Sequence, residues 1–183
     1  MQVVNQFTFF QRGVRGMNKI SILIGIGANL SPDGYATPRE GCEAAIASLA
    51  ELGIDVVAVS PWYETAPVPV SDQPWFNNAV IAATTSMSAP DALVALHSVE
   101  ARFGRIRTVR NAARVMDLDL LDYGGRTYDE ENIKIPHPRL HERAFVLLPM
   151  QDVAPDYTHP LNGLGIDDLI AALPDDQQIR KAD

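Results

Sequence analysis

The chain has 183 residues, of which 46% are apolar and 21% charged, and its formal net charge is −8. This length and composition fit one soluble globular domain with a core of its own. The acidic balance argues against nucleic acid or an anionic membrane as a partner, and no apolar run approaches the roughly 18 residues of a membrane-spanning helix.

The chain is interpreted as a short arm followed by one domain. Residues 1–16 lack the apolar stretch and the cleavage site of a secretory signal, so we expect a disordered N-terminal arm. Arg12 and Arg15 leave an organelle-targeting peptide as an alternative. Residues 17–183 are expected to form a single domain, acting as a monomer.

The single cysteine, Cys42, excludes a disulfide framework and favours a reduced compartment, most simply the cytoplasm.

The first elements follow from alternation and from capping signals. Residues 19–26 alternate and are β-branched, which predicts a strand. Residues 37–40 have the pattern of a helix N-cap followed by proline, and the helix is expected to end at Gly53. Strands are then predicted over residues 54–63 and 76–85, separated by a proline-rich loop.

The remaining elements complete a recognisable order. A second capped helix is predicted to begin at Ser88, and a further strand spans residues 115–123. This order predicts an α/β (α+β) fold with a ferredoxin-like βαββαβ core, whose antiparallel sheet is covered by flanking helices on one face. Residues 130–183 form a C-terminal extension with a short amphipathic segment near residues 166–173.

Basic residues are concentrated in one segment. Five arginines fall within 13 residues that contain no acid: Arg102, Arg105, Arg107, Arg110 and Arg114. Guanidinium groups make bidentate contacts with phosphates, so this segment predicts a polyphosphate site. The alternative is a solvated helix end, where cations are also favourable.

Two aspartates follow the arginines inside the last predicted strand. Alternation places Asp117 and Asp119 on one face and Leu118 on the other. Neighbouring carboxylates repel unless a cation lies between them, and Mg²⁺ favours oxygen ligands that it shares with nucleotide phosphates. An exposed edge strand would explain an isolated pair. A pair beside so many arginines instead supplies the metal and the neutralising charge that phosphoryl transfer requires.

Three other segments carry candidate ligands. The glycines at 25 and 27 lack the third glycine and the immediate helix of a dinucleotide loop, so Asn29 is expected to approach a ligand or to brace a neighbour. Phe76 and Asn78 fit a flat heterocycle, although adjacent aromatic residues are more often core. His137 lies in a loop rich in arginine and histidine, where it either contacts phosphate or has a structural role.

In order, these segments resemble the 6-hydroxymethyl-7,8-dihydropterin pyrophosphokinase family over residues 20–155. The matching segments are GANL at 27–30, YET at 63–65, DQPWFNNAV at 72–80, GRIR at 104–107, DLDLLDYG at 117–124 and PHPRLHERAFVLLP at 136–149. The resemblance implies Mg²⁺-dependent transfer of pyrophosphate from ATP to the pterin in folate biosynthesis, with AMP released after attack on the β-phosphorus.

The resemblance also implies a role for each matching position. Two Mg²⁺ ions would be held by Asp117 and Asp119. The pterin would be bound by Thr65, Phe76, Asn78 and Phe145. ATP would be bound by Arg107, Arg110, Leu120, His137 and Arg143. Catalysis would depend on Arg105, Arg114 and Asp119, the last as a metal ligand or as a proton relay, and Glu100 would anchor the site.

Some positions depart from the common family pattern. Many members carry Trp-Gly-Pro between two loop arginines, where this chain has residues 111–113, Asn-Ala-Ala, in a stretch one residue shorter. Phe76 stands where tyrosine is common, and Ala66 and Pro69 also differ. Because no metal ligand is lost, we expect an active enzyme whose loop closes differently.

Two rival functions are less consistent with the sequence. Another metal-dependent nucleotidyl- or glycosyltransferase with a DxD pair would not require residues 72–78. A ferredoxin-like RNA-binding module would expose aromatic residues with basic flanks on its sheet, whereas this sheet carries an aspartate pair in an acidic protein. A small-molecule sensor module is the other non-catalytic alternative.

Overall fold

The main sheet is antiparallel and has six strands. The computed structural model describes residues 19–67, 71–105 and 113–182. The strands are β1 (Ile20–Ala28), β2 (Ile54–Val59), β3 (Tyr63–Thr65), β4 (Phe76–Thr85), β5 (Asp117–Tyr123) and β8 (Ile179–Lys181). Their order is β5-β1-β4-β3-β8, and β2 pairs with β4 as well. The predicted βαββαβ core is confirmed, with β2 and β3 on successive parts of β4.

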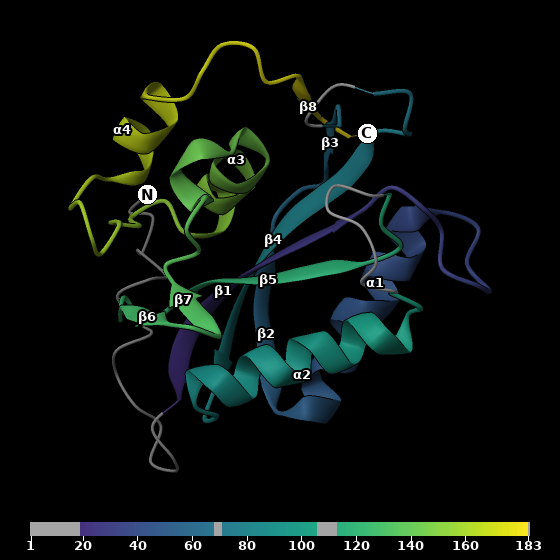
Figure 1. The fold of residues 1–183 in the computed structure, drawn as a ribbon, viewed down its shortest axis with the longest axis horizontal. Coiled ribbons are helices and arrows are strands. Elements are labelled where there is room, and N and C mark those ends of the chain that lie inside the picture. Colours follow the sequence, from purple (N-terminus) through teal and green to yellow (C-terminus); the bar gives the residue numbers. More distant parts are fainter. Residues whose placement is uncertain (1–18, 68–70, 106–112, 183) are drawn as a thin grey trace, which may run out of the picture.

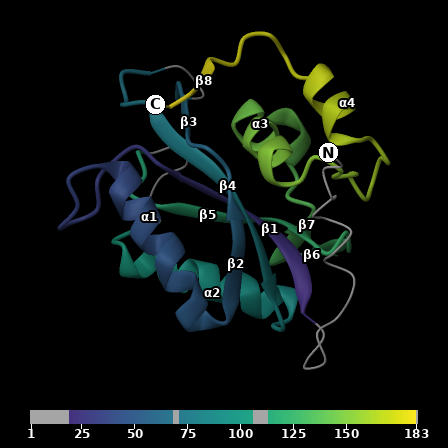
Figure 2. The ribbon, with the colours of Figure 1, turned by 180° about the vertical axis from the view of Figure 1, so that it is seen from behind.

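Helices cover both faces of this sheet (Figures 1 and 2). They are α1 (Pro38–Ser48), α2 (Ala89–Arg102), α3 (Ala144–Val153) and α4 (Ile166–Ala171), with 3₁₀ turns at Leu49–Leu52 and Leu140–Glu142 and a small hairpin of β6 (Tyr128–Glu130) and β7 (Ile133–Ile135). α1 and α2 lie on one face and α3 on the other, with α4 beside α3. In the ranges described, no helix has the length and apolar character to cross a membrane.

The helix starts agree with the sequence pattern. Thr37 Oγ1 accepts a hydrogen bond from the Glu40 N–H at 3.2 Å, and Ser88 Oγ accepts one from the Asp91 N–H at 3.3 Å. A proline follows each cap within the first two helical positions, where its missing N–H costs nothing. The first helix tightens into a 3₁₀ turn and ends at Gly53, whose φ of 80° suits glycine.

Two separate apolar cores pack against the sheet. Ile24 and Leu118 face α1 and α2, whereas Val80 and Leu121 face α3. The two helices of the βαββαβ core thus cover one face, as predicted, and α3 of the C-terminal extension covers the other. Residues 144–153 are apolar at almost every position, so no periodic pattern marked them as a helix.

The strand predicted over residues 54–63 is divided in two. Pro61 has no N–H to give to the ladder, and β2 ends before it. At Ser60 the side chain supplies the acceptor in place of a backbone carbonyl: Ser60 Oγ accepts a hydrogen bond from the Val80 N–H at 3.0 Å. The break lets β3 continue along β4 with its own register, in which Thr65 lies opposite Phe76.

Candidate functional site

A row of paired residues crosses the sheet and defines the site. Asp117 on β5 lies opposite Gly27 on β1, which lies opposite Asn78 on β4, and Asn78 lies opposite Tyr63 on β3. Adjacent strands are about 4.8 Å apart, so Asp117 and Asn78 are separated by about 10 Å. Leu118 packs on the α1 and α2 side, so alternation places Asp117 and Asp119 on the α3 side, as predicted.

Gly27 keeps the middle of this row free of a side chain. A Cβ atom at this position would lie 2.5 Å from Asn78 Oδ1, much closer than packed atoms allow. The side-chain amide of Asn78 therefore leaves room for glycine alone at position 27. This explains the glycine in the GANL segment without a dinucleotide loop.

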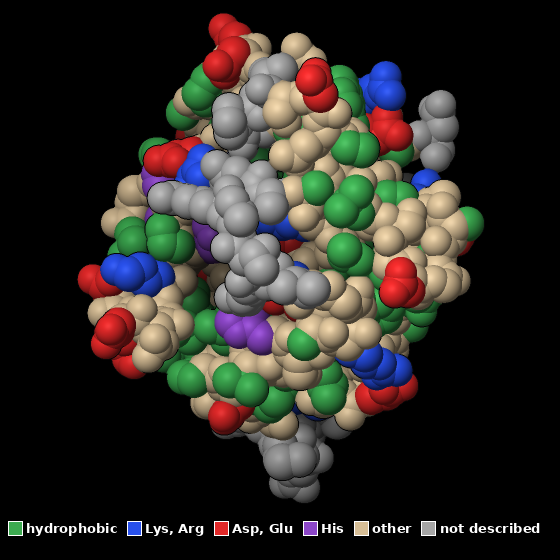
Figure 3. All heavy atoms as spheres, turned by 45° about the vertical axis from the view of Figure 1, so that its right-hand side comes forward, with side chains coloured by type: hydrophobic (Ala, Val, Ile, Leu, Met, Phe, Trp, Pro, Cys, Tyr) green, Lys and Arg blue, Asp and Glu red, His purple; other side chains and the backbone are tan. Residues whose placement is uncertain are grey.

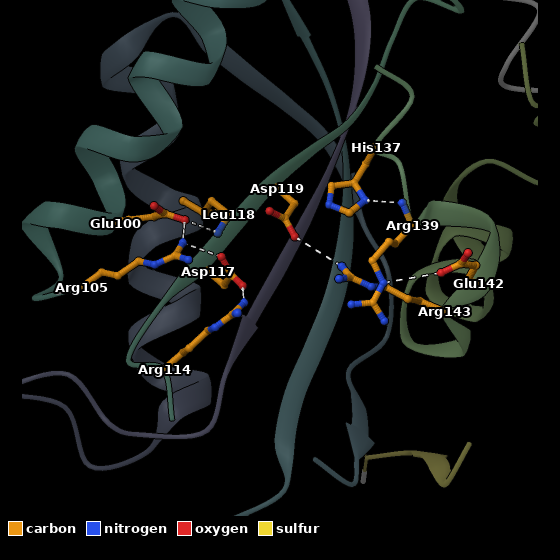
Figure 4. A network of polar contacts seen from close by, with 10 residues as sticks. All are labelled: Glu100, Arg105, Arg114, Asp117, Leu118, Asp119, His137, Arg139, Glu142 and Arg143. Atoms are coloured by element: carbon orange, nitrogen blue, oxygen red, sulfur yellow. Dashed lines mark hydrogen bonds and ion pairs between the residues drawn. The ribbon is translucent and has the colours of Figure 1, made fainter. Parts of the chain in front are cut away.

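The charged part of the site centres on Asp117. Arg105 and Arg114 both donate hydrogen bonds to its carboxylate, one to each oxygen (Figure 4). Glu100, 1% exposed, accepts from Arg105 and from the Leu118 N–H, the latter at 2.8 Å. The end of α2 is thereby tied to β5 through a buried carboxylate, which is the anchoring position expected of Glu100.

Asp119 is the more accessible of the two aspartates. Its side chain is 38% exposed, against 14% for Asp117, and its Oδ2 lies 3.8 Å from Arg143 Nη1. Within the described ranges, no group of three or more His, Cys, Asp or Glu side chains is arranged to hold a metal. Two carboxylates nevertheless suit Mg²⁺, which commonly binds one or two of them and takes its other ligands from water and phosphate.

His137 and Arg143 form the other border of the charged part. The Arg139 N–H donates to His137 Nδ1 at 3.1 Å, and the His137 N–H donates to the Leu121 carbonyl at 2.9 Å. Burial lowers the pKa of His137, which favours the neutral ring, and the acceptor role of Nδ1 then places the proton on Nε2. Burial also lowers the pKa of Arg143, whose guanidinium remains charged at neutral pH. This border therefore offers hydrogen-bond donors to an anion.

The charged residues are surrounded by side chains of both signs at the surface. Seen from the direction of Figure 3, histidine, acidic and basic side chains gather around the middle of the molecule, beside the atoms drawn in grey. Arg139 and Glu142, next to the site along the chain, form one exposed pair at 3.5 Å. Such pairs are screened by solvent and contribute little to stability.

A neutral part of the site lies on β3 and β4. Asn78 Nδ2 donates to Thr65 Oγ1 at 2.8 Å, and the two side chains are almost completely buried. Phe76 is the cross-strand partner of Thr65 and is half-buried. Phe145 is half-buried in the first turn of α3, where the Arg143 guanidinium lies 5.3 Å from the centre of its ring. The structure thus brings Thr65, Phe76 and Asn78 together and places Phe145 beside Arg143.

Comparison with known proteins agrees with this arrangement. Residues 23–155 match the family described as 7,8-dihydro-6-hydroxymethylpterin-pyrophosphokinase (HPPK). The chain belongs to the HPPK family. It is therefore a transferase, a pyrophosphokinase of folate biosynthesis, as the sequence resemblance implied.

Relatives of similar length support the assignment. The chain is 39% identical to a 2-amino-4-hydroxy-6-hydroxymethyldihydropteridine pyrophosphokinase from Pseudomonas aeruginosa, over 84% of this chain and 91% of the relative. A protein of the same name from Haemophilus influenzae is 33% identical, over 88% of this chain and 98% of the relative.

A solved structure supports the fold. The wild-type HPPK-DHPS of Plasmodium falciparum superposes with a TM-score of 0.65 at 14% identity, over 86% of this chain and 45% of that one. The HPPK chain therefore spans less than half of that solved protein.

One link between the two parts of the HPPK site was only partly foreseen. Asn29, 2% exposed, accepts a hydrogen bond from the Arg114 N–H at 2.7 Å. It also donates to Gln73 Oε1 at 3.2 Å and to the Pro74 carbonyl at 3.1 Å. Of the two roles left open from sequence, the structure supports the brace: Asn29 joins the end of the arginine segment to the loop before β4.

Several sequence assignments stay predictions. Leu120 packs in the core beneath α1 and α2, on the face opposite to Asp119, and its contact with ATP remains a prediction. Arg107 and Arg110 lie outside the described residues, as do Pro69 and the arm at residues 1–16. The replaced Trp-Gly-Pro segment also falls mostly outside them.

A cavity elsewhere in the HPPK chain shares no residue with this site. A cavity of about 660 Å³ opens between the start of α1 and the β3–β8 edge, with Asn77 in its lining. Asn77 is the neighbour of Asn78 in β4, so its side chain points to the opposite face of the sheet. The cavity therefore lies on that face. Its cations already have carboxylate partners: Arg39 pairs with Glu43, Arg180 with Glu64 and Lys181 with Asp152. This cavity is therefore a poorer candidate for a polyphosphate.

Proposed function

We propose that the chain transfers pyrophosphate from ATP to 6-hydroxymethyl-7,8-dihydropterin in a Mg²⁺-dependent reaction that releases AMP. The supporting observation is one sheet face that carries a carboxylate–guanidinium cluster two strands from a buried amide–hydroxyl pair. A triphosphate requires the first chemistry and a neutral pterin ring requires the second. The two small molecules are its expected partners, and we expect the enzyme to act as a monomer.

The charged part is assigned to ATP. Asp117 and Asp119 would hold two Mg²⁺ ions, which supply charge neutralisation to the triphosphate. Arg105 and Arg114 both contact Asp117. A triphosphate bound through Mg²⁺ at this carboxylate would therefore lie beside both guanidiniums. His137 Nε2 and Arg143 offer further donors to the phosphates. Arg107 and Arg110 are proposed to join them on the sequence resemblance alone.

The neutral part is assigned to the pterin. Thr65 and Asn78 supply a hydroxyl and an amide that are already oriented by their mutual hydrogen bond. Phe76 and Phe145 supply the aromatic faces against which a flat ring stacks. Phe76 lacks the hydroxyl of the tyrosine common in the family, so it contributes stacking and no hydrogen bond.

The chemical step is an in-line displacement at the β-phosphorus. The hydroxymethyl oxygen of the pterin forms a bond to this phosphorus, and the bond from it to the α–β bridging oxygen breaks. AMP leaves with that oxygen, while the β–γ linkage moves intact. Arg105 and Arg114 stabilise the charge that develops on the phosphoryl oxygens, and Asp119 is the candidate acceptor of the hydroxyl proton.

Identification of the products tests this function. The protein is incubated with ATP, Mg²⁺ and 6-hydroxymethyl-7,8-dihydropterin, and the products are separated and identified by mass. We expect AMP and a pterin that carries two phosphates, formed only when all three components are present. Parallel incubations offer a sugar or a nucleotide as the acceptor. Turnover of one of these acceptors without turnover of the pterin would contradict the proposal.

A further inference from the structure

The C-terminal segment reaches back to the start of α3. Gln177 Oε1 accepts a hydrogen bond from the Ala144 N–H at 2.8 Å, and Gln177 Nε2 donates to the Glu142 carbonyl at 2.9 Å. One side-chain amide thus binds the peptide groups on both sides of Arg143. It also caps the first turn of α3, while the Arg143 side chain turns to Asp119.

The same segment is joined to the edge of the sheet. β8 pairs with β3 so that Ile179 lies opposite Thr65, and the Ala66 N–H donates to the Gln178 carbonyl at 3.1 Å. A chain segment of a few residues therefore contacts both β3, which carries Thr65, and the turn that carries Arg143. These two elements are otherwise far apart in the sequence.

A second set of contacts fixes the other end of α3 to the same edge. Asp152 Oδ2 accepts a hydrogen bond from the Tyr63 hydroxyl at 2.6 Å, and Asp152 Oδ1 lies 3.1 Å from Lys181 Nζ. Contacts of Gln177 and Asp152 thus join both ends of α3 to the segment that contains β8 and to β3. Core packing of Val146 and Leu147 holds the body of the helix, and Gln177 fixes the two peptide groups that flank Arg143.

We propose that Gln177 is a positioning residue, which sets the location of Arg143 and Phe145 relative to Thr65. The inference rests on the proposed function, in which these residues contact ATP and the pterin. Residues 177–181 then act as a brace between two walls of one pocket. Glu142 is exposed, so water can replace the hydrogen bond to its carbonyl, and the stability cost of losing Gln177 comes mainly from the Ala144 N–H, whose residue is 5% exposed. A shift of about 1 Å in a substrate contact, by contrast, is enough to cost up to about a hundredfold in rate.

Replacing Gln177 by Met tests the brace. Methionine keeps the length of the side chain and removes both hydrogen bonds. We expect kcat/KM for the pterin to fall about tenfold or more, mostly through KM, while Tm changes by no more than about 4 °C. Gln178→Met is the matched control, because Gln178 is exposed and contributes its backbone carbonyl, and it should behave as the wild type. Gln177→Glu should recover part of the loss, since a carboxylate still accepts from the Ala144 N–H.

Amide hydrogen exchange supplies a readout that does not depend on turnover. The Ala144 N–H should exchange faster in Gln177→Met than in the wild type and in Gln178→Met. Unchanged exchange, or a wild-type KM in Gln177→Met, would overturn the inference, and so would a fall in Tm without a change in KM. A wild-type protein that consumes no pterin would count against the proposed function instead.

Discussion

The two parts of the site differ in how their polar groups are satisfied. At and just before β5 the charged side chains pair with one another and stay partly open to solvent: the side chains of Asp119 and Arg114 are 38% and 34% exposed. On β3 and β4, Thr65 and Asn78 are 5% and 6% exposed and share a neutral hydrogen bond. One part contains charges whose partners are open to exchange with a ligand, and the other is a fixed and largely dry surface.

This difference follows from what each ligand demands. A metal–triphosphate complex brings its own charges, so its site must offer ions that exchange one partner for another. A neutral heterocycle gains from preorganised groups that need no rearrangement. The charged part should therefore be sensitive to loss of charge, and the neutral part to loss of shape and hydrogen bonding.

Loss of charge on β5 should have the largest effect. We expect Asp117→Asn and Asp119→Asn each to lower kcat by about a hundredfold or more, because a neutral amide is a poor Mg²⁺ ligand. Binding of the pterin should persist, and the fluorescence of Trp75, 39% exposed and next to Phe76, provides the measurement. Near-normal rates at saturating Mg²⁺ would show that the metal assignment is wrong.

The two aspartate variants should differ in stability. Asp117→Asn removes a carboxylate charge that pairs with both Arg105 and Arg114, so its Tm should fall clearly. Asp119→Asn removes one distant pairing at 3.8 Å, and its Tm should stay close to that of the wild type. Equal losses of Tm would contradict this distinction.

Loss of the buried amide should impair the neutral part alone. In Asn78→Ala we expect KM for the pterin to rise about tenfold and KM for ATP to change less than about twofold. The free energy of unfolding should fall by about 1 kcal/mol as the bond to Thr65 is lost. Asn77→Ala is the matched control on the opposite face and should change neither KM. An equal rise in both KM values for Asn78→Ala would argue against separate parts.

Loss of the link between the parts should have a smaller effect on both. Asn29→Ala removes the hydrogen bonds to the Arg114 N–H and to residues 73 and 74, so both KM values should rise several-fold. Ser31→Ala, an exposed position two residues away, serves as the control. A change confined to one substrate would show that Asn29 supports one part and does not join them.

The smallest effect is expected at the far end of β5, where a carboxylate has no counter-charge within the part of the chain that the structure describes. Burial raises the pKa of Asp122, and its Oδ2 has no hydrogen-bond partner among the described residues. The raised pKa means that folding is favoured most below the ordinary carboxyl pKa and that stability is lost as pH rises through the folded value. Asp122→Asn should therefore raise Tm at pH 7 by a few degrees and give a smaller gain near pH 3. A lower Tm at pH 7 would contradict this account.

Local signals made much of the fold predictable. β1 follows from alternation, and both capped helices follow from a hydroxyl residue and a proline at fixed spacing. β8 has three residues, too few to show a pattern, and becomes a strand through its pairing with β3. The helical state of α3 was hidden by its uniform apolar composition.

The site shows the same division between local and distant information. The shared face of Asp117 and Asp119 follows from alternation, and the structure confirms it. The bonds of Asn29 reach 44 and 85 residues along the chain, and those of Gln177 reach 33 and 35. Sequence spacing gives no access to such partners, so the residues that join the parts of the site became visible only in the folded chain.

The central claim is that the charged part directs attack to the β-phosphorus. ATP labelled at the β-phosphate distinguishes this from ordinary kinase chemistry in one incubation with the pterin and Mg²⁺. The account predicts that the label appears on the pterin and that unlabelled AMP forms in equal amount. Label retained in ADP, with a singly phosphorylated pterin, would contradict it.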